Sequence, residues 1–287
     1  MLPIDRVFEE HRPGLERLAY RMLGSLTDAD DVMQDAYLKW TREVRTAVKS
    51  PRSYLTSLVT RLCIDQRRAI EARKEKYVGP WLPEPVVGPA DPVEAAEAVS
   101  MAVLVVLESL SPVERAAYLL RRVFDFGYDE IGEVLGKNEP ACRQLVSRAE
   151  ERVRERRPRF DPDPVEAGRI TNQFLATCAT GDVGDLVSLL AEDAVLYSDG
   201  GGKALAALAP IYGADRVARF ILGVRKKGAD RLRFEPVTVN GRPGVIAWDG
   251  DQVHSVLTLD VADGRVTNVF IVRNPDKLAR VKGEPAA

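Results

Sequence analysis

The chain has 287 residues and a formal net charge of −2, so it is long enough for two or three domains but is not a uniformly basic nucleic-acid coat. Three cysteines far apart in the chain and two histidines support neither a disulfide framework nor a metal site. Neither a long apolar run nor a signal peptide is present, so we expect a cytoplasmic protein without a membrane segment.

The first 76 residues have the pattern of a small all-α domain. Apolar residues recur at helical spacing in three segments, at residues 4–24, 28–44 and 51–74. Asp28 is expected to cap the second helix, and Ser50 with Pro51 opens the third. The polar face of the second helix is formed by Asp30, Asp31, Gln34 and Asp35. Acidic residues near a helix N-terminus compensate its dipole, but this cluster continues past the first turn and also indicates a docking surface for a basic partner.

A second all-α domain is predicted over residues 91–157, between Pro- and Gly-rich linkers at residues 77–90 and 158–164. A capping box at residues 91–94 is expected to start a helix that leads to Leu110.

The strongest pattern in this domain is a helix-turn-helix. Ser111 and Glu114 form a second capping box, followed by a short helix over residues 128–135 that Gly136 ends. Asn138 caps a long last helix. Its expected inner face is Ala141, Leu145, Ala149 and Val153, and its expected outer face is Arg143, Gln144, Ser147 and Arg148. This succession indicates DNA binding, although an ordinary helical hairpin with a solvated basic face is the alternative.

Residues 165–287 change to a helix-then-strand pattern, which predicts an α+β domain. Helices are expected at residues 165–180, 185–190 and 213–227, and strands at 194–198, 232–239, 244–248, 253–259 and 266–272. The hairpin signals are Asn240-Gly241, Asp249-Gly250 and Asp263-Gly264. The expected fold is thus two all-α domains, then helices that cover one face of a curved antiparallel sheet.

Positive charge is concentrated in two segments. Residues 42–76 carry ten Lys and Arg against four Asp and Glu, and residues 137–159 carry eight against four. Two separate basic segments in a nearly neutral chain are consistent with two contacts along one nucleic acid.

The sequence 28-DADDVMQDA-36 resembles the core-polymerase-binding helix of extracytoplasmic-function sigma factors. Residues 53–68 resemble the segment of these proteins that melts and reads the promoter −10 element, and residues 111–157 resemble their −35-reading domain. The resemblance implies core RNA polymerase (β′ and β subunits) and promoter DNA as partners, without a cofactor, a metal or a catalytic residue in this chain.

The resemblance assigns the acidic face of the second helix to core polymerase. The expected −10 contacts are Arg42, Arg52, Tyr54, Arg61, Arg67 and Arg68, and the expected −35 contacts are Lys137, Arg143, Gln144, Ser147 and Arg148. The loop at residues 42–54 lacks the asparagine or aromatic clustering that would identify a base-stacking residue. Tyr54 is a candidate whose spacing fits the core better.

Three further motifs resemble the sigma factors that carry a fused C-terminal SnoaL-like (NTF2-like) domain, a cone-shaped fold. They are Trp81-Leu82-Pro83-Glu84-Pro85, Asp199-Gly200-Gly201-Gly202-Lys203 and Asn274-Pro275-Asp276-Lys277-Leu278. We expect the glycine loop and the last motif to hold the linker around Trp81 and so to tune activity. The alternative is a plain β-turn with exposed ends, and polymerase is another candidate partner of the loop. The resemblance leaves two alternatives open: a separate anti-sigma protein as a partner, or its replacement by this fused domain.

Two other functions remain open at this stage. The third domain could be a ligand sensor or a SnoaL-like cyclase or isomerase, but its single histidine, His254, has no second titratable group at a suggestive spacing. The chain could also be a two-domain repressor, against which the acidic face of the second helix argues.

Overall fold

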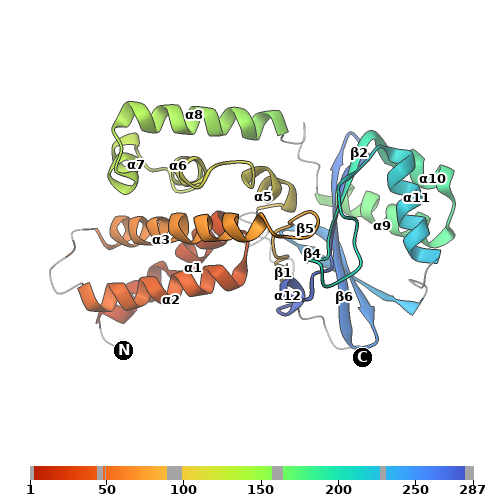
Figure 1. Ribbon diagram of the computed structural model, residues 1–287, viewed down its shortest axis with the longest axis horizontal. Helices are drawn as coiled ribbons and strands as arrows, with labels where there is room; N and C mark the ends of the chain where they lie inside the picture. The colour runs from red at the N-terminus through yellow and green to blue at the C-terminus, as the bar shows by residue number, and fades with distance from the viewer. Residues whose placement is uncertain are drawn as a thin grey trace. The chain divides into compact units, whose positions relative to one another are not determined.

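The computed structural model describes residues 3–43, 48, 50–88, 99–156, 164–226 and 231–281. The chain forms two compact units. The first comprises residues 1–76 and 106–156 and is helical; the second comprises residues 77–105 and 157–287 and contains the sheet (Figure 1). The expected capping box at residues 91–94 and most of the linker at residues 158–164 lie outside the described residues.

Three long helices form the first part of the helical unit, α1 (Pro3–Leu23), α2 (Leu26–Glu43) and α3 (Pro51–Lys74). Each helix contacts the other two. Their apolar faces bury Phe8, Leu18, Trp40, Leu55 and Val59. Ser50 caps α3 as expected, with its side chain accepting a hydrogen bond from the backbone N–H of Ser53.

The prediction for the start of α2 is wrong in one detail. Ser25, not Asp28, is the cap, because the Ser25 hydroxyl accepts the backbone N–H of Asp28 at 3.1 Å. Asp28 therefore lies in the first turn, where it is buried.

The helix-turn-helix consists of α6 (Pro112–Arg122), α7 (Tyr128–Leu135) and α8 (Glu139–Arg156). The capping box of Ser111 and Glu114 is present, and Gly136 takes the left-handed conformation with φ +64°. The three helices share a core of Ala117, Leu120, Phe126, Ile131, Val134, Cys142 and Val146. Helix α6 also contacts α1 and α3, so this motif belongs to the same compact unit as the first three helices.

One burial prediction in this region is corrected. The fully buried positions of α8 are Cys142, Val146, Ala149 and Val153, so the inner face is displaced by one residue at its N-terminal end.

A mixed sheet of seven strands forms the second unit, in the order β1-β4-β5-β6-β7-β2-β3. The strands are β1 (Val87–Gly88), β2 (Leu190–Asp199), β3 (Ile211–Tyr212), β4 (Arg233–Val239), β5 (Arg242–Asp249), β6 (Gln252–Ala262) and β7 (Arg265–Val272). Strands β4 to β7 form the expected meander. The sheet is not wholly antiparallel as predicted, since β2 pairs parallel with β7.

The two faces of this sheet are covered by different segments. Helices α9 (Pro164–Thr180), α10 (Val183–Leu189) and α11 (Ala214–Lys226) pack on one face. The other face packs against Leu82 of the linker, against Met101 and Ala102 of α5 (Met101–Leu107), and against Leu278 of α12 (Pro275–Leu278). The segment before the helix-turn-helix is therefore part of the core of the sheet domain.

The linker also extends the sheet. Val87 and Gly88 form β1, which pairs antiparallel with β4. The expected single helix from residue 91 to Leu110 is not observed in the described part, because Val99 and Ser100 are not helical and α5 begins at Met101.

Candidate nucleic-acid interface and linker-binding site

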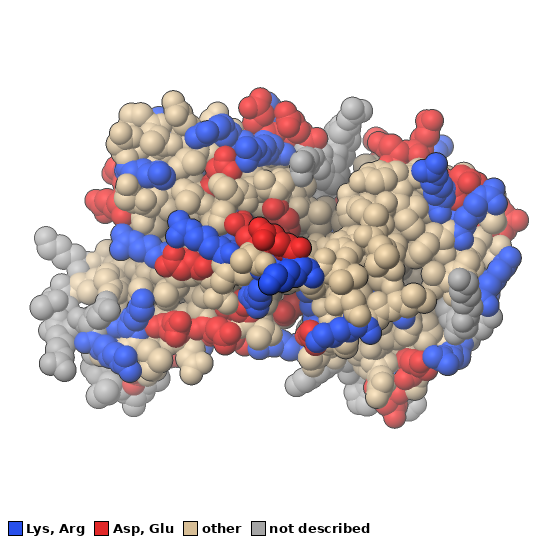
Figure 2. All heavy atoms as spheres, in the orientation of Figure 1, with Lys and Arg blue, Asp and Glu red and all other residues tan. Residues whose placement is uncertain are grey.

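The outer face of α8 presents the side chains that the sequence predicted. Arg143, Gln144, Ser147 and Arg148 are all exposed. They face outward because Cys142, Val146 and Ala149 occupy the inner face at helical spacing. Lys and Arg side chains gather along α8 in the view of Figure 2.

Arg143 is held in place by two neighbours. Its Nη2 lies 2.5 Å from Glu139 Oε1, and its guanidinium lies over the ring of Tyr128 at 4.4 Å. Tyr128 was not predicted as a functional residue, since nothing in the local pattern identifies a ring at the start of α7 as a support for α8. A guanidinium held in this way loses less side-chain entropy when it contacts DNA.

The turn between α7 and α8 is tight for a steric reason. The backbone N–H of Lys137 donates to the carbonyl of Gly132 at 3.0 Å, and a Cβ on Gly132 would lie 2.5 Å from the Lys137 carbonyl oxygen. Asn138 Oδ1 accepts the backbone N–H of Ala141 and caps α8. The exposed side chain of Lys137 follows directly from this turn.

The acidic face of α2 is exposed at Asp30, Asp31, Gln34 and Asp35. Asp28 differs from them, because it accepts hydrogen bonds from Gln66 at 2.7 Å and Arg73 at 2.8 Å. Burial raises the pKa of Asp28, but the hydrogen bonds from Arg73, Ser25 and Gln66 outweigh it and lower the pKa overall. Asp28 thus joins α2 to α3, while the exposed carboxylates further along α2 present a negative surface.

The six predicted −10 residues separate into two groups. Arg42, Arg52 and Arg68 are exposed, and Tyr54 is half-buried with its ring 5.8 Å from that of Trp40. Much of the loop between Arg42 and Arg52 lies outside the described residues.

Arg61 and Arg67 form the other group, because both are hydrogen-bonded to other parts of the protein; Arg61 remains exposed and Arg67 is buried. Arg61 donates to the carbonyls of Glu133 and Val134 at the end of α7, both at 3.0 Å. Arg67 is 1% exposed and pairs with Glu108, so in this conformation its guanidinium is not at the surface where the predicted −10 contact would be made. The cause is tertiary, because α6 and the residues before it cover this part of α3.

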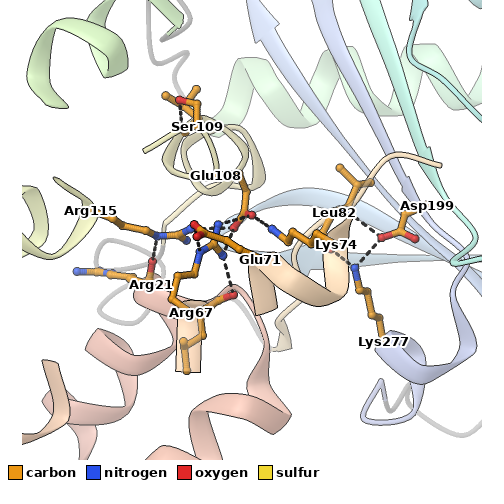
Figure 3. Close-up of polar contacts among 12 residues, drawn as sticks. Arg21, Arg67, Glu71, Lys74, Leu82, Glu108, Ser109, Arg115, Asp199 and Lys277 are labelled. Atoms are coloured by element: carbon orange, nitrogen blue, oxygen red, sulfur yellow. Dashed lines mark hydrogen bonds and ion pairs between the residues drawn. The ribbon is translucent and has the colours of Figure 1, made fainter. Parts of the chain in front are cut away.

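The linker-binding site is centred on Asp199, the last residue of β2, which is fully buried. Its carboxylate accepts hydrogen bonds from the Leu82 backbone N–H at 2.8 Å and from Lys277 Nζ at 2.7 Å (Figure 3), and a third from the Tyr77 hydroxyl at 2.5 Å, which the figure does not label. Two of these three donors belong to the linker, so Asp199 fixes the linker on the sheet domain.

Lys277 completes this contact, because it binds both Asp199 and the linker. Its Nζ donates to the Leu82 carbonyl at 2.5 Å and lies 3.7 Å from the centre of the Trp81 ring, a cation–π distance. Burial lowers the pKa of Lys277, an effect that the charge of Asp199 opposes. Burial also raises the pKa of Tyr77, as does its hydrogen bond to Asp199.

The glycine loop allows this close approach. A Cβ on Gly201 would lie 2.4 Å from Asn274 Nδ2 and 2.9 Å from the Tyr77 hydroxyl, and Gly201 has a φ of +59° that favours glycine. Asn274 itself donates to the Tyr77 hydroxyl at 2.8 Å and caps α12. Tyr77 is the residue of this site that the sequence motifs did not identify.

The remaining motif residues divide between the buried contact and the surface. Pro83, Glu84 and Pro85 are buried. Lys203 and Asp276 form an exposed ion pair at 2.5 Å. Gly200 cannot carry a Cβ, because that atom would lie 2.2 Å from the Ala204 carbonyl oxygen. Gly202 has a φ of +72° and lies against Val78. Pro275 is exposed.

His254 makes no contact typical of a general base. Its Nε2 lies 2.8 Å from Arg273 Nη2 and its Nδ1 lies 3.3 Å from Ser255 Oγ. Burial and the charge of Arg273 lower its pKa, which favours a neutral ring that accepts a hydrogen bond from Arg273. Within the described ranges there is no cluster of three or more His, Cys, Asp or Glu that could hold a metal ion, and no helix with the length and apolarity to cross a membrane.

Comparisons with known proteins identify the helical unit. Residues 7–73 match the family model of sigma-70 region 2, and residues 100–153 match that of sigma-70 region 4. Over 94% of its length the chain is 38% identical to the ECF RNA polymerase sigma factor SigJ of Mycobacterium tuberculosis, of which the match covers 91%. This chain belongs to the extracytoplasmic-function (ECF) RNA polymerase sigma factors.

One further relative and one solved structure extend the similarity of this sigma factor to the sheet domain. The probable ECF sigma factor SigI of M. tuberculosis is 29% identical, with 98% of this chain and 97% of SigI covered. The crystal structure of M. tuberculosis SigJ superposes with a TM-score of 0.77 at 36% identity, and covers 95% of this chain and 97% of that one. The helical regions followed by a C-terminal sheet domain are therefore shared with SigJ.

Proposed function

We propose that this ECF sigma factor binds core RNA polymerase through the exposed acidic face of α2 and brings it to promoter DNA through α3 and α8. Asp30, Asp31, Gln34 and Asp35 supply the negative surface for the β′ subunit, and contact with the β subunit follows from the family. The observation that carries this assignment is the contrast on α2 between the buried Asp28 and the exposed acidic positions after it. Acidic residues kept on the surface well beyond the first turn fit recognition of a basic partner better than local neutralisation.

Charge reversal of this face tests the assignment. Asp31→Lys combined with Asp35→Lys is expected to abolish co-elution with purified core RNA polymerase. The matched control, Asp182→Lys with Asp185→Lys in the sheet domain, is expected to co-elute like the unmodified chain. Equal binding by the α2 variant would refute the assignment. A chain active with polymerase works in the cytoplasm, where the polymerase is.

On α8, Arg143 and Arg148 with Gln144 and Ser147 are assigned to the −35 element, and Lys137 to the DNA backbone. Arg42 in the last turn of α2 and Arg52 and Arg68 on α3 are exposed and ready to contact −10 DNA, with Tyr54 as a base-contact candidate. Arg61 and Arg67 join them only after leaving their present protein partners.

We further propose that the sheet domain modulates this activity by holding the linker. Asp199, Lys277 and Asn274 bind the segment at Tyr77–Leu82, and the same face of the sheet buries the start of α5. Because α5 leads directly into the helix-turn-helix, its capture limits the positions that the −35-reading helix can reach. The domain thereby supplies within one chain a control for which the family commonly uses a separate anti-sigma protein.

Transcription reconstituted with core polymerase tests the proposed modulation. Asp199→Asn is expected to change the yield of promoter-dependent transcript, while Lys203→Ala, which alters only an exposed ion pair of the same motif, leaves it unchanged. Identical yields from Asp199→Asn and the unmodified chain would refute a modulating role. The contacts of His254 favour neither a catalytic nor a ligand-sensing function for the domain.

A further inference from the structure

One carboxylate in the helical unit is surrounded by three cationic side chains. Glu108 accepts a bidentate pair from Arg67, with Nη1 at 3.0 Å and Nη2 at 2.7 Å, and a hydrogen bond from Arg115 Nη1 at 2.8 Å (Figure 3). Lys74 Nζ also contacts Glu108. The second nearby carboxylate, Glu71, lies 3.8 Å from Arg67 Nε, beyond hydrogen-bond distance.

The cations come from two separate parts of the helical unit. Arg67 and Lys74 belong to α3, which lies in the region-2 match except for its last residue, Lys74, whereas Arg115 belongs to α6 in the region-4 match. Arg115 also donates to the carbonyl of Arg21 on α1 at 2.8 Å. Glu108 and its partners therefore join the two parts that must separate on DNA if each reads its own promoter element.

The cluster depends on Glu108 for its charge balance. Arg67 is 1% exposed and Arg115 is 0% exposed. Within the described structure, Arg67 Nε and Arg115 Nη2 are buried without a hydrogen-bond partner. Buried cations are tolerated only when they are paired, so removal of the Glu108 charge would leave an uncompensated surplus of positive charge.

A second contact reinforces the same junction. Arg61 on α3 donates to the carbonyls of Glu133 and Val134, in the last turn of α7. The last carbonyls of a helix carry partial negative charge, so they attract a guanidinium. Two of the arginines assigned to −10 DNA are thus both engaged with the part of the chain that contains the helix-turn-helix.

We propose that Glu108 is an intramolecular latch that takes the place of a DNA phosphate on α3. A carboxylate and a phosphate present similar bidentate acceptors to arginine, so one can replace the other. With Glu108 bound, Arg67 is withheld from DNA and α6 to α8 stay docked on α3. Promoter binding requires Arg67 to exchange the carboxylate for phosphate and the two parts to separate. This inference rests on the proposed assignment of α3 to −10 DNA.

The test is the separation between α2 and α8 in the full chain. Spin labels at Lys39→Cys and Glu151→Cys, two exposed positions outside every contact described above, report the distance distribution. Glu108→Gln keeps the shape of the side chain and removes its charge. It is expected to broaden the distribution toward longer distances, while the matched exposed control Glu133→Gln keeps the narrow distribution of the unmodified chain. An unchanged distribution for Glu108→Gln overturns the latch.

DNA affinity supplies the second measurement, with a fluorescent oligodeoxythymidine as a sequence-independent single-stranded probe. If about one molecule in ten is open before the substitution, release raises the apparent affinity about tenfold. An opened Glu108→Gln chain with unchanged affinity overturns the exchange of carboxylate for phosphate. If circular dichroism shows that Glu108→Gln unfolds, Arg67→Met with Lys74→Met, which frees α3 from Glu108 and leaves the carboxylate paired with Arg115, is expected to lengthen the same distance. A narrow distribution in that variant overturns the latch.

Failure of the latch and failure of the proposed function are distinguishable. Core binding and transcription by the unmodified chain test the function. The distance measurement uses neither polymerase nor a promoter, so it can fail while transcription succeeds.

Discussion

Asp199→Asn is the most informative single substitution in the linker-binding site. It keeps the shape of the side chain but removes the negative charge that faces Lys277, whose side chain is 6% exposed. Loss of one partner of a buried ion pair costs about 3–5 kcal/mol. In Asp199→Asn, Lys277 keeps its contacts with the Leu82 carbonyl and the Trp81 ring. Burial already lowers the pKa of Lys277, so its ammonium can also lose a proton, which removes the unpaired charge. We therefore expect a cost at the lower end of this range, about 3 kcal/mol.

Amide hydrogen exchange of the linker measures this cost directly, because the Leu82 N–H is bound to the Asp199 carboxylate. A loss of about 3 kcal/mol corresponds to roughly a hundredfold increase in the opening equilibrium. We expect residues 77–88 to exchange about that much faster in Asp199→Asn at neutral pH.

The matched control lies in the same motif. Lys203→Ala removes an exposed ion pair with Asp276, and such pairs contribute at most about 1 kcal/mol, so the linker is expected to exchange within a few-fold of the unmodified chain. Equal exchange rates in Asp199→Asn and Lys203→Ala would refute the reasoning, since they would show that the buried charge does not hold the linker.

Three further predictions concern the helical unit. Gly132→Ala should destabilise it by about 1–3 kcal/mol in urea titrations, because the new Cβ would clash with the Lys137 carbonyl. In the control, Gly14→Ala in α1, the new Cβ meets nothing within 4 Å, so this variant should be neutral or stabilising. Equal effects of the two substitutions would contradict the steric argument. Burial raises the pKa of Glu114, but hydrogen bonds from Ser111 and the charge of Arg152 outweigh it and lower the pKa overall. Ionised Glu114 therefore stabilises the folded chain above pH 4.5, the ordinary pKa of a glutamate, and this stabilisation is lost as the pH falls through the lower pKa of the folded state. Glu114→Gln should therefore lower the urea midpoint at pH 7 and flatten its decline in acid, and an unchanged acid profile would argue against the pair. Arg148→Ala should weaken promoter binding, measured by fluorescence anisotropy, by about 1–3 kcal/mol if Arg148 contacts a base. If it contacts phosphate, the substitution should instead reduce the slope of log affinity against log salt concentration by about one. The control Arg169→Ala in α9 should bind the promoter like the unmodified chain.

The features that the sequence predicted well are those set by neighbouring residues. Ser111 and Glu114 are three residues apart, and their capping box forms within one turn of α6. Gly136 and the Asn240-Gly241 turn need positive φ, which the residue type itself supplies. Caps and turns of this kind can be predicted from the sequence because they do not depend on residues far away in the chain.

The features that were missed depend on residues far apart in the chain. Arg67 and Arg68 are adjacent and chemically identical, but Arg67 is buried against Glu108 and Arg68 is exposed beside Asp65. The addition of β1 to the sheet and the one-residue displacement of the α8 core face likewise follow from packing. No local pattern distinguishes these cases.

The linker-binding site likewise has one part that the sequence predicted and another part that only the fold shows. Its three motifs came from the resemblance, and the structure brings their residues together. The depth of burial that separates Asp199 and Lys277 from Lys203 and Asp276 follows from the fold alone. The contribution of Tyr77 also requires the fold, because a lone tyrosine before a proline-rich stretch has no distinctive pattern.

The most direct test of the account is transcription in vitro with purified core RNA polymerase and a library of promoter fragments. The account predicts that the full chain yields transcripts from defined start sites that share −35 and −10 sequences, and that Asp31→Lys with Asp35→Lys yields none. Absence of any start site that depends on the chain, or equal transcription by the α2 variant, would contradict it.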